Sequence, residues 1–359
     1  MIYIEGYALI SSLGKSAKES IECLRNKPIL PLDIEGIKYY KIVDNEPLGY
    51  YDSIEKVVRD AIYDAKISTE ELKSTALFIG TSSAKLPINE AHAKECGVLI
   101  KELYMSEVGD IIAKRIGLSG YRTIISTACT SSSNALIQAK EMIESGLIKR
   151  AIVVGVELYN ELSIKGFDSF MLLSKNSLRP FDKSRDGIVL GEALSAIVLG
   201  DKPSDVTLVG GAICVDTGSI TAPNFKNLKD VMHQAILSAK IIPNDIKLIK
   251  AHATASMQND IAEAQAISLL FGKNRPNILT LKPYIGHTMG ACGTNEFALL
   301  LASFEQGIIP KSINSNEIDE ECGVTPNLEE LVAKEGYYLL NYFGFGGNNS
   351  SLVIKYEER

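Results

Sequence analysis

Apolar residues recur at helical spacing in two similar segments of the chain. Residues 57–67 read VVRDAIYDAKI and residues 231–241 read VMHQAILSAKI, so six of eleven positions are identical. Each segment is followed by an acidic turn and then by a short apolar run typical of a strand, at residues 76–79 and 248–249. The pattern predicts one helix-then-strand unit that occurs twice, 174 residues apart (231 − 57).

A second repeat follows the first in the same order. Residues 123–125 form a strand-like run that leads to Cys129 and then to a helical segment. Residues 278–281 form another such run, which leads to His287 and a further helical segment. A single repeated segment is compatible with chance similarity between amphipathic helices, but two repeats in the same order favour an internal duplication.

The duplication predicts two halves, residues 1–202 and 203–359, with the turn at 201–205 between them. Strands that alternate with helices predict an α/β protein with mostly parallel sheets, covered by helices on both faces. We expect the sheets of the two halves to lie side by side and to share helices between them.

Composition narrows the function classes. Lys and Arg number 37 and Asp and Glu 44, so the net charge is −7 and gives no overall attraction for nucleic acid or anionic membranes. No apolar run approaches the ~20 residues of a membrane span, and residues 1–7 lack a basic signal-peptide start, which predicts a cytoplasmic protein. The six cysteines are scattered without a Cys-x-x-Cys pair, so we expect free thiols and no metal site.

Cys129 is the first candidate for chemistry. It lies in the predicted strand-to-helix turn, where a helix dipole and free N–H groups would lower the thiol pKa and favour the nucleophilic thiolate. Alternatively, it is a buried cysteine that acts as a small apolar residue. The chain has four histidines, and two of them, His252 and His287, lie in turns that follow strands, where α/β proteins expose functional groups.

A glycine-rich segment, residues 343–347, precedes the last predicted strand. Glycines there would let the backbone approach a ligand closely, although an ordinary hairpin turn explains them as well. A phosphate loop is disfavoured, because no Lys-Ser/Thr pair follows the glycines and the next element is a strand.

Five segments in order carry a family resemblance: 127–131 (TACTS), 179–192 (RPFDKSRDGIVLGE), 251–256 (AHATAS), 281–290 (LKPYIGHTMG) and 343–347 (FGFGG). With these motifs the chain resembles the β-ketoacyl-acyl carrier protein synthases, the condensing enzymes of the thiolase superfamily. The resemblance implies a thiolase-like α/β fold, in which two duplicated halves form a five-layered αβαβα core. The N-terminal half would carry the nucleophilic cysteine, and the C-terminal half the two histidines.

The resemblance also implies roles for single residues. Cys129 would accept an acyl group, while His252 and His287 would bind the malonyl thioester carbonyl and assist decarboxylation. The backbone N–H groups of Cys129 and Phe345 would form the oxyanion hole. The remaining implied residues are the supporting charged pair Lys282 and Glu296, and the pantetheine or substrate contacts Thr254, Ser256, Phe343, Phe167 and Ala84.

The His pair favours an elongating, decarboxylating enzyme, because thiolases use a second Cys and initiating synthases use His with Asn. This chain departs from the family with Ala253 and Ala255 near the first histidine and with Asn348 after the glycine-rich segment. The added methyl groups could crowd the pantetheine arm. In the segment at residues 80–84, Ala84 could open the floor of the acyl pocket.

The resemblance implies an acyl carrier protein as partner and a dimer, formed with a second copy or with a related subunit. No cofactor is implied beyond the phosphopantetheine arm of the carrier. Five basic residues lie between the motifs (Lys165, Lys175, Arg179, Lys183 and Arg185). They would either bind the acidic carrier or form an ordinary solvated face.

The main alternative function is that of a non-catalytic partner subunit that resembles a chain-length factor. A Cys-His hydrolase and a zinc-binding module are weaker alternatives. The acyl substrate is left open, since fatty acid, polyketide and polyene pathways share this chemistry.

Overall fold

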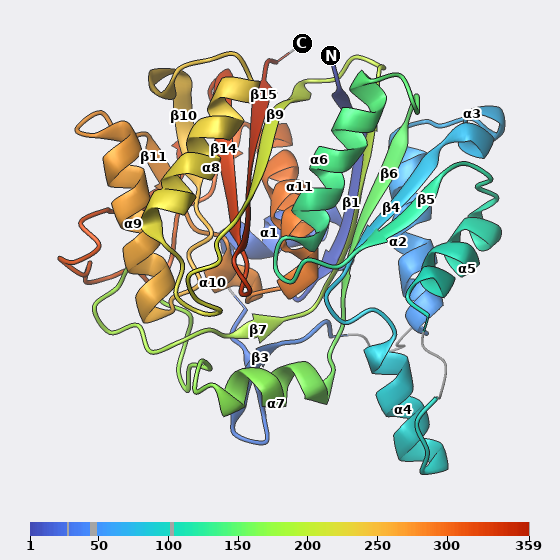
Figure 1. The fold of residues 1–359 in the computed structure, drawn as a ribbon, viewed down its shortest axis with the longest axis horizontal. Coiled ribbons are helices and arrows are strands. Elements are labelled where there is room, and N and C mark those ends of the chain that lie inside the picture. The colour runs from blue at the N-terminus through green and yellow to red at the C-terminus, as the bar shows by residue number, and fades with distance from the viewer. Residues whose placement is uncertain (27–28, 44–48, 101–103, 359) are drawn as a thin grey trace.

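The computed structural model describes residues 1–26, 29–43, 49–100 and 104–358. Its centre is a ten-stranded sheet made of two five-stranded halves (Figure 1). In the N-terminal half the strand order is β5 (Arg122–Ile125), β4 (Ala76–Gly80), β6 (Ala151–Glu157), β8 (Ala193–Gly200) and β1 (Tyr3–Ser11). In the C-terminal half it is β11 (Asn277–Leu279), β10 (Ile246–Lys250), β14 (Gly336–Phe343), β15 (Asn348–Tyr356) and β9 (Val206–Val215).

The two halves repeat one topology. Numbered along the chain within each half, the strands lie in the order 3-2-4-5-1 both times. The halves meet where Tyr3 of β1 pairs with Thr207 of β9, next to the break between β8 and β9 at residues 201–205. This repeat confirms the duplicated fold that the sequence predicts.

The expected mostly parallel pairing is wrong. In each half the outer strands pair in parallel, as in β4 with β5 and β6, and β10 with β11 and β14. The inner strands are antiparallel, because β8 and β15 run against both of their neighbours. The reversal in the second half comes from the glycine-rich segment, which forms the tight turn that joins β14 directly to β15.

Helices complete five layers around the two half-sheets (Figure 1). The outer layers are α2 (Tyr50–Asp64) with α5 (Ser106–Ile116), and α8 (Phe225–Ser238) with α9 (Met257–Phe271). The central layer is α6 (Ser131–Glu144) and α11 (Cys292–Glu305), which pack against each other. They approach so closely at Gly293 that a Cβ atom there would lie 2.1 Å from the backbone nitrogen of Ser133.

The two sequence repeats correspond to matching elements. Residues 57–67 lie mostly in α2 and residues 231–241 mostly in α8, and each helix buries its repeated apolar positions against its own half-sheet. The second repeat is β5 with α6 and β11 with α11. Burial of equivalent helix faces in both halves explains why the same apolar spacing occurs twice.

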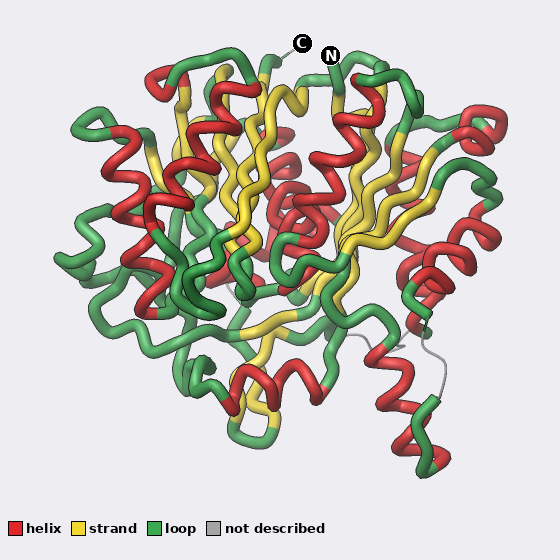
Figure 2. Tube along the Cα trace, viewed as in Figure 1, coloured by secondary structure: helices red, strands yellow, loops and turns green. Residues whose placement is uncertain are grey.

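The remaining elements are shorter and surround this core. They are α1 (Ala17–Asn26), β2 (Leu32–Ile34), β3 (Ile37–Tyr40), α3 (Thr69–Ser74), α4 (Leu86–Cys96), α7 (Glu161–Ser169), β7 (Leu190–Gly191), η1 (Pro243–Asp245), α10 (Lys282–Ile285), η2 (Met289–Ala291), β12 (Ile308–Ile309) and β13 (Leu331–Val332). Figure 2 shows both chain ends above the strands and many loops below them in that view. Among the described residues, no helix has the length and apolar character needed to cross a membrane.

Candidate active site

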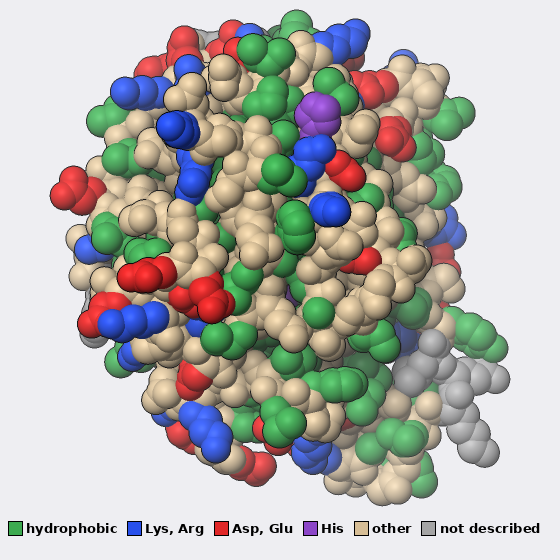
Figure 3. Space-filling model, turned by 60° about the vertical axis from the view of Figure 1, so that its left-hand side comes forward, with side chains coloured by type: hydrophobic (Ala, Val, Ile, Leu, Met, Phe, Trp, Pro, Cys, Tyr) green, Lys and Arg blue, Asp and Glu red, His purple; other side chains and the backbone are tan. Residues whose placement is uncertain are grey.

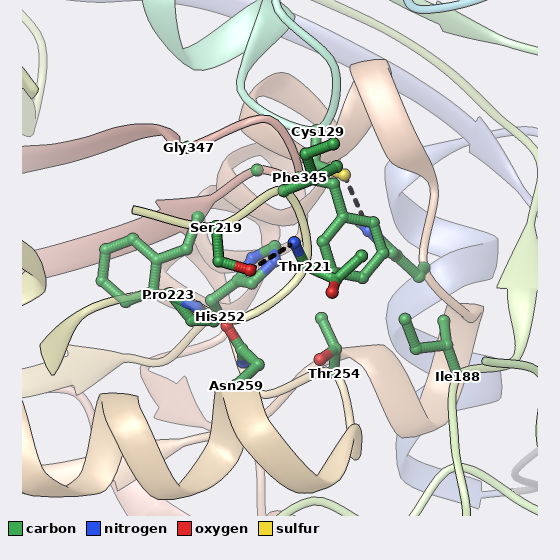
Figure 4. A pocket seen from close by; sticks show the side chains of 14 residues that line it. Cys129, Ile188, Ser219, Thr221, Pro223, His252, Thr254, Asn259, Phe345 and Gly347 are labelled. Carbon is green, nitrogen blue, oxygen red and sulfur yellow. Dashed lines mark hydrogen bonds between the residues drawn. The ribbon is translucent and has the colours of Figure 1, made fainter. Parts of the chain in front are cut away.

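The nucleophile candidate Cys129 lies in the turn between β5 and α6, as the sequence predicts. The turn is tight, since the preceding Ala128 has a φ of +53°, in the left-handed region. The Cys129 side chain is buried, and its Sγ lies 3.1 Å from Nε2 of His287 (Figure 4). The backbone N–H groups of Phe345 and Cys129 also act on this sulfur, and both lower its pKa.

The expected lowering of the Cys129 pKa is wrong. Burial raises the pKa of the thiol to about 11, although the N–H of Phe345 and the charge of Lys282 act in the opposite direction. The turn geometry is the one predicted, but desolvation of the thiolate outweighs the local N–H groups. Burial therefore favours the protonated thiol.

The two histidines converge on the cysteine from the C-terminal half. His252 follows β10 and His287 follows α10, and their ring centroids are 5.4 Å apart at nearly perpendicular planes. Burial, together with the charge of Lys282, lowers the pKa of both imidazoles well below the usual value, so both are neutral. Nζ of Lys282 lies 3.3 Å from Nδ1 of His252. Because an ammonium group can only donate, Nδ1 of His252 must accept, and Nε2 carries the proton.

A buried charged triad supports this pair. Nζ of Lys282 lies 2.6 Å from Oε1 of Glu296, as the resemblance implies. The other carboxylate oxygen, Oε2, bonds Nζ of Lys250, which also donates to the carbonyl of Asn341 at 2.7 Å and lies 3.7 Å from the ring centre of Tyr342. Sequence reasoning missed Lys250. The available signal was a lysine at the end of a buried strand, two residues before His252.

The loop that carries His252 is strained and held by two buried carboxylates. Ala253 and Ala255 have φ values of +47° and +63°, in the left-handed region where glycine is favoured. Glu263 of α9 accepts the backbone N–H groups of His252 and Ala253, each at 2.8 Å. Asp260, also on α9, accepts the N–H of Ala255 at 3.1 Å. These bonds keep the loop in place despite the two methyl groups.

A cavity opens in front of the reactive groups (Figure 4). Its lining contains six of the predicted residues, namely Cys129, His252, His287, Thr254, Phe343 and Phe345. Gly344 and Gly347 belong to the glycine-rich segment that the sequence predicts to approach a ligand, and Ile188 lies in the motif at 179–192. The lining residues that the sequence did not single out are Ser219, Ile220, Thr221, Pro223 and Asn259. The hydroxyl-bearing segment 219–223 has no motif of its own, and only the fold brings it to the cavity.

Three predicted substrate contacts lie outside this lining. The Ser256 hydroxyl caps α9 by accepting the N–H of Asn259 at 3.3 Å. Phe167 packs against Phe345, with ring centroids 5.7 Å apart. Ala84 is buried, and its carbonyl accepts the hydroxyl of Tyr50 at 2.7 Å. Substrate contacts for these three residues stay predictions.

Asn348, one of the departures from the family pattern, has a structural role. Its Oδ1 accepts the Thr130 hydroxyl at 2.7 Å and the side-chain amide of Asn134 at 2.8 Å. It therefore ties the hairpin between β14 and β15 to the start of α6, next to Cys129.

The basic group predicted as a possible carrier site is largely paired. Lys165 bonds Glu161 at 2.9 Å, Lys183 bonds Glu317, and Arg185 forms a buried ion pair with Asp319. Arg179 bonds the hydroxyls of Ser177 and Ser184, and Lys175 is exposed. Figure 3 likewise shows acidic and basic side chains intermingled on the face it presents. Within the described ranges, no group of three or more His, Cys, Asp or Glu side chains could hold a metal ion.

Comparison with known proteins gives a consistent result. Family models match in both halves: the N-terminal domain of β-ketoacyl synthases over residues 54–204 and their C-terminal domain over residues 207–316. A 3-oxoacyl-[acyl-carrier-protein] synthase 2 of Synechocystis sp. is 29% identical over 329 residues, covering 83% of this chain and 79% of the relative. A putative mitochondrial 3-oxoacyl-[acyl-carrier-protein] synthase of Schizosaccharomyces pombe is 30% identical over 342 residues, covering 82% and 78%.

Solved structures agree on the fold. The ishigamide ketosynthase/chain length factor superposes with a TM-score of 0.87 at 24% identity, over 99% of both chains. The ketosynthase ApeO in complex with its chain length factor ApeC from Xenorhabdus doucetiae superposes with a TM-score of 0.85 at 25% identity, covering 99% of this chain and 98% of that one. The fold is therefore that of the ketosynthases, as the resemblance implies. With family models that match well over half of its residues, and with cysteine and histidines placed around one cavity, the chain belongs to the β-ketoacyl synthase family.

Proposed function

We propose that this chain catalyses decarboxylative Claisen condensation, joining a malonyl unit on acyl carrier protein to an acyl chain held on Cys129. The observation that carries the proposal is the meeting of three groups at one cavity. The Cys129 sulfur lies 3.1 Å from His287, and His252 stands edge-on to His287 beside it. The names of the relatives, which are 3-oxoacyl-acyl carrier protein synthases, support the same reaction class.

Acyl transfer to Cys129 comes first. The sulfur attacks the acyl thioester carbonyl, the C–S bond to the carrier's pantetheine arm breaks, and the Cys129 proton ends on the released pantetheine thiol. Negative charge on the attacked oxygen would be bound by the N–H groups of Cys129 and Phe345.

Decarboxylation of the malonyl group follows. The carboxylate leaves as carbon dioxide, and its bonding electrons move toward the thioester oxygen, which needs hydrogen-bond donors at that moment. His252 offers such a donor, because Lys282 occupies its Nδ1 and leaves the proton on Nε2. A neutral imidazole donor stabilises the developing charge without protonating the carbon nucleophile.

Condensation completes the cycle. The carbanion attacks the acyl carbonyl on Cys129, the C–S bond breaks, and the sulfur leaves as a thiolate that takes up a proton from solvent. The product is a 3-ketoacyl chain that is two carbons longer. Thr254 and Asn259 line the cavity and would contact the pantetheine arm, for which Thr254 offers a hydroxyl group.

For partners, we propose an acyl carrier protein and a second ketosynthase-like subunit, either another copy or a related chain, in the cytoplasm. One solved structure similar to this chain is a ketosynthase with its chain length factor, and another, at 20% identity, is a ketosynthase with its acyl carrier protein. Of the basic group described above, Arg185 is buried in its ion pair, whereas Lys165, Lys175 and Lys183 are exposed and available to the carrier.

The test uses the purified chain with acyl-carrier thioesters of several lengths, followed by malonyl carrier protein. Intact mass should show an acyl adduct that Cys129→Ala lacks, and condensation should follow malonyl addition. His252→Ala should keep the adduct but lose ~10²–10³-fold in decarboxylation, the usual cost of one oxyanion donor. A folded wild-type protein that forms no adduct with any chain length, alone or with a copurifying related subunit, would contradict the proposal and favour a non-catalytic partner role.

A further inference from the structure

The imidazole of His287 lies between two thiols. Its Nε2 faces Sγ of Cys129 at 3.1 Å, and its Nδ1 faces Sγ of Cys292 at the same distance. Cys292 is the first residue of α11 and is fully buried. The hydroxyl of Thr288 lies 3.5 Å from the Cys292 sulfur and can donate to it. The result is a chain of polar contacts that runs from Thr288 through Cys292 and His287 to Cys129.

We propose that Cys292 is a positioning residue that sets the tautomer of His287, by donating its S–H to Nδ1 so that the N–H of Nε2 faces Cys129 and the substrate. The inference rests on the proposed condensation and deepens it. It assigns to a second cysteine the task that Lys282 performs for His252. The reacting atoms touch His287, not Cys292.

The direction of the contact follows from the partners on each side. Thr288 can fill an acceptor position of the Cys292 sulfur, so the thiol proton is free to point at Nδ1. Burial raises the pKa of the Cys292 thiol to about 12, so the group keeps the proton that it donates. Among the described residues, Cys292 is the hydrogen-bond partner that the structure gives to Nδ1 of His287.

The opposite direction would defeat the chemistry. If Nδ1 carried the proton and donated to Cys292, Nε2 would present a lone pair to the reacting centre. A lone pair cannot stabilise the oxygen of a malonyl thioester as negative charge develops on it. Two donors at that oxygen require the Nε2 proton on both histidines, and the structure places a separate hydrogen-bond donor at Nδ1 of each ring.

The two hydrogen-bond donors differ in charge, since Lys282 is an ammonium group and Cys292 is a neutral thiol. His252 receives its hydrogen bond from the ammonium of Lys282, whose charge Glu296 balances. A cation at the corresponding nitrogen of His287 would need its own buried counter-ion close to Cys129. A thiol supplies a donor without charge and without that cost.

The first test reads the tautomer directly. The ¹⁵N spectra of histidine-labelled protein distinguish the two nitrogens of each ring, and His287→Asn assigns the signals. Wild type should show the proton on Nε2 of His287. Cys292→Ala should lose that preference, and Cys292→Ser should keep it. The proton on Nδ1 in wild type, or an unchanged tautomer in Cys292→Ala, would overturn the inference.

The second test is kinetic and uses Cys322→Ala as the matched control, because Cys322 is a buried thiol in the C-terminal half, outside the cavity lining. Cys292→Ala should lower kcat for malonyl decarboxylation about 10-fold with little change in KM, the lower end of the cost of losing a partner that orients a histidine ring. Cys292→Ser should restore most of the rate, and the control should match wild type. Equal losses in Cys292→Ala and Cys322→Ala would contradict the positioning role.

The two tests separate two kinds of failure. The spectra need no substrate, so they decide the tautomer even if the chain performs no condensation. One combined result is an Nε2–H tautomer that depends on Cys292, in a wild-type protein that does not decarboxylate malonyl carrier protein. This result would support the role of Cys292 in setting the tautomer and would contradict the proposed function. If Cys292→Ala does not fold, the wild-type spectrum and Cys292→Ser still decide the question.

Discussion

The two halves of the molecule share a topology but bury different polar chemistry at equivalent places. After the third strand of each half, a turn presents one reactive side chain, Cys129 in the first and His287 in the second, and a central helix follows. In α6 the first turn buries only neutral polar residues, from Ser131 to Asn134. In α11 the corresponding region buries Glu296, which two lysines contact. The duplicated frame thus fixes where the reactive groups stand, while a buried carboxylate between two lysines lies near the start of α11 and has no counterpart at the start of α6.

The difference follows from what each half must stabilise. Cys129 is a buried thiol that N–H groups of its own turn and of Phe345 act on, and the residues at the start of α6 beside it are neutral. The histidines must stay neutral and hold one tautomer, which the buried lysines promote by disfavouring a further positive charge. The following predictions test this contrast between a neutral and a charged helix start, with the largest expected effect first and the smallest last.

The largest effect on stability should come from Glu296→Gln. Burial alone would raise the pKa of this carboxyl, but Lys250 and Lys282 hold it below its usual value, so the native protein contains the carboxylate. Its removal leaves two buried ammonium groups without a counter-ion, and should lower the free energy of unfolding by about 3–5 kcal/mol. Urea unfolding followed by circular dichroism measures the loss.

The matched change at the neutral start of α6 is Ser133→Ala. The Ser133 hydroxyl lies 2.7 Å from that of Ser350, and both are buried. Truncation leaves one hydroxyl without this partner and should cost roughly 1–2 kcal/mol. Equal losses of unfolding free energy in Glu296→Gln and Ser133→Ala would show that the buried charge near the start of α11 adds no stability beyond that of the neutral contacts at the start of α6.

A third effect is the pH dependence of the loop that carries His252. Burial raises the pKa of Asp260 to about 7. Between about pH 4, where the unfolded carboxyl titrates, and about pH 7, the native state keeps a proton that the unfolded chain has released, so the Asp260 contribution to stability falls as pH rises.

Asp260→Asn isolates this contribution. The unfolding free energy of wild type minus that of the variant should decrease by up to about 1.4 kcal/mol per pH unit across this window, and should level off above it. Urea unfolding at several pH values gives the difference. A difference that is flat, or that increases with pH, would contradict the raised pKa.

The smallest effect should come from relief of backbone strain. Ala128 in the first half and Ala253 in the second both have left-handed φ values, +53° and +47°. Replacement by glycine removes the steric penalty, but adds backbone freedom to the unfolded chain and removes a methyl group. Each variant should change the free energy of unfolding by less than about 1 kcal/mol, as thermal or urea unfolding would show. A large loss at Ala253 alone would mean that its methyl group is an essential part of the packing around His252.

Much of the fold and site could be predicted from local pattern. The repeated apolar spacing of α2 and α8 predicted the duplication, and the strand-exit turns predicted Cys129, His252 and His287 as candidates. Lys250 was missed, because its acidic partner, Glu296, lies 46 residues away in another element. The directions of β8 and β15 were missed for a related reason, since an apolar run does not reveal whether its neighbours run parallel to it.

The sequence by itself determined the repeat, the elements, the family and the residue types available for chemistry, because these depend on local spacing and on motifs that are read along the chain. Only the tertiary structure decided which of these groups meet and how each is charged. The thiol pKa of Cys129 is the clearest case: its turn favours the thiolate, but burial by both halves raises the pKa to about 11. Desolvation and pairing depend on everything that surrounds a group, and those surroundings exist only after the two halves have packed together.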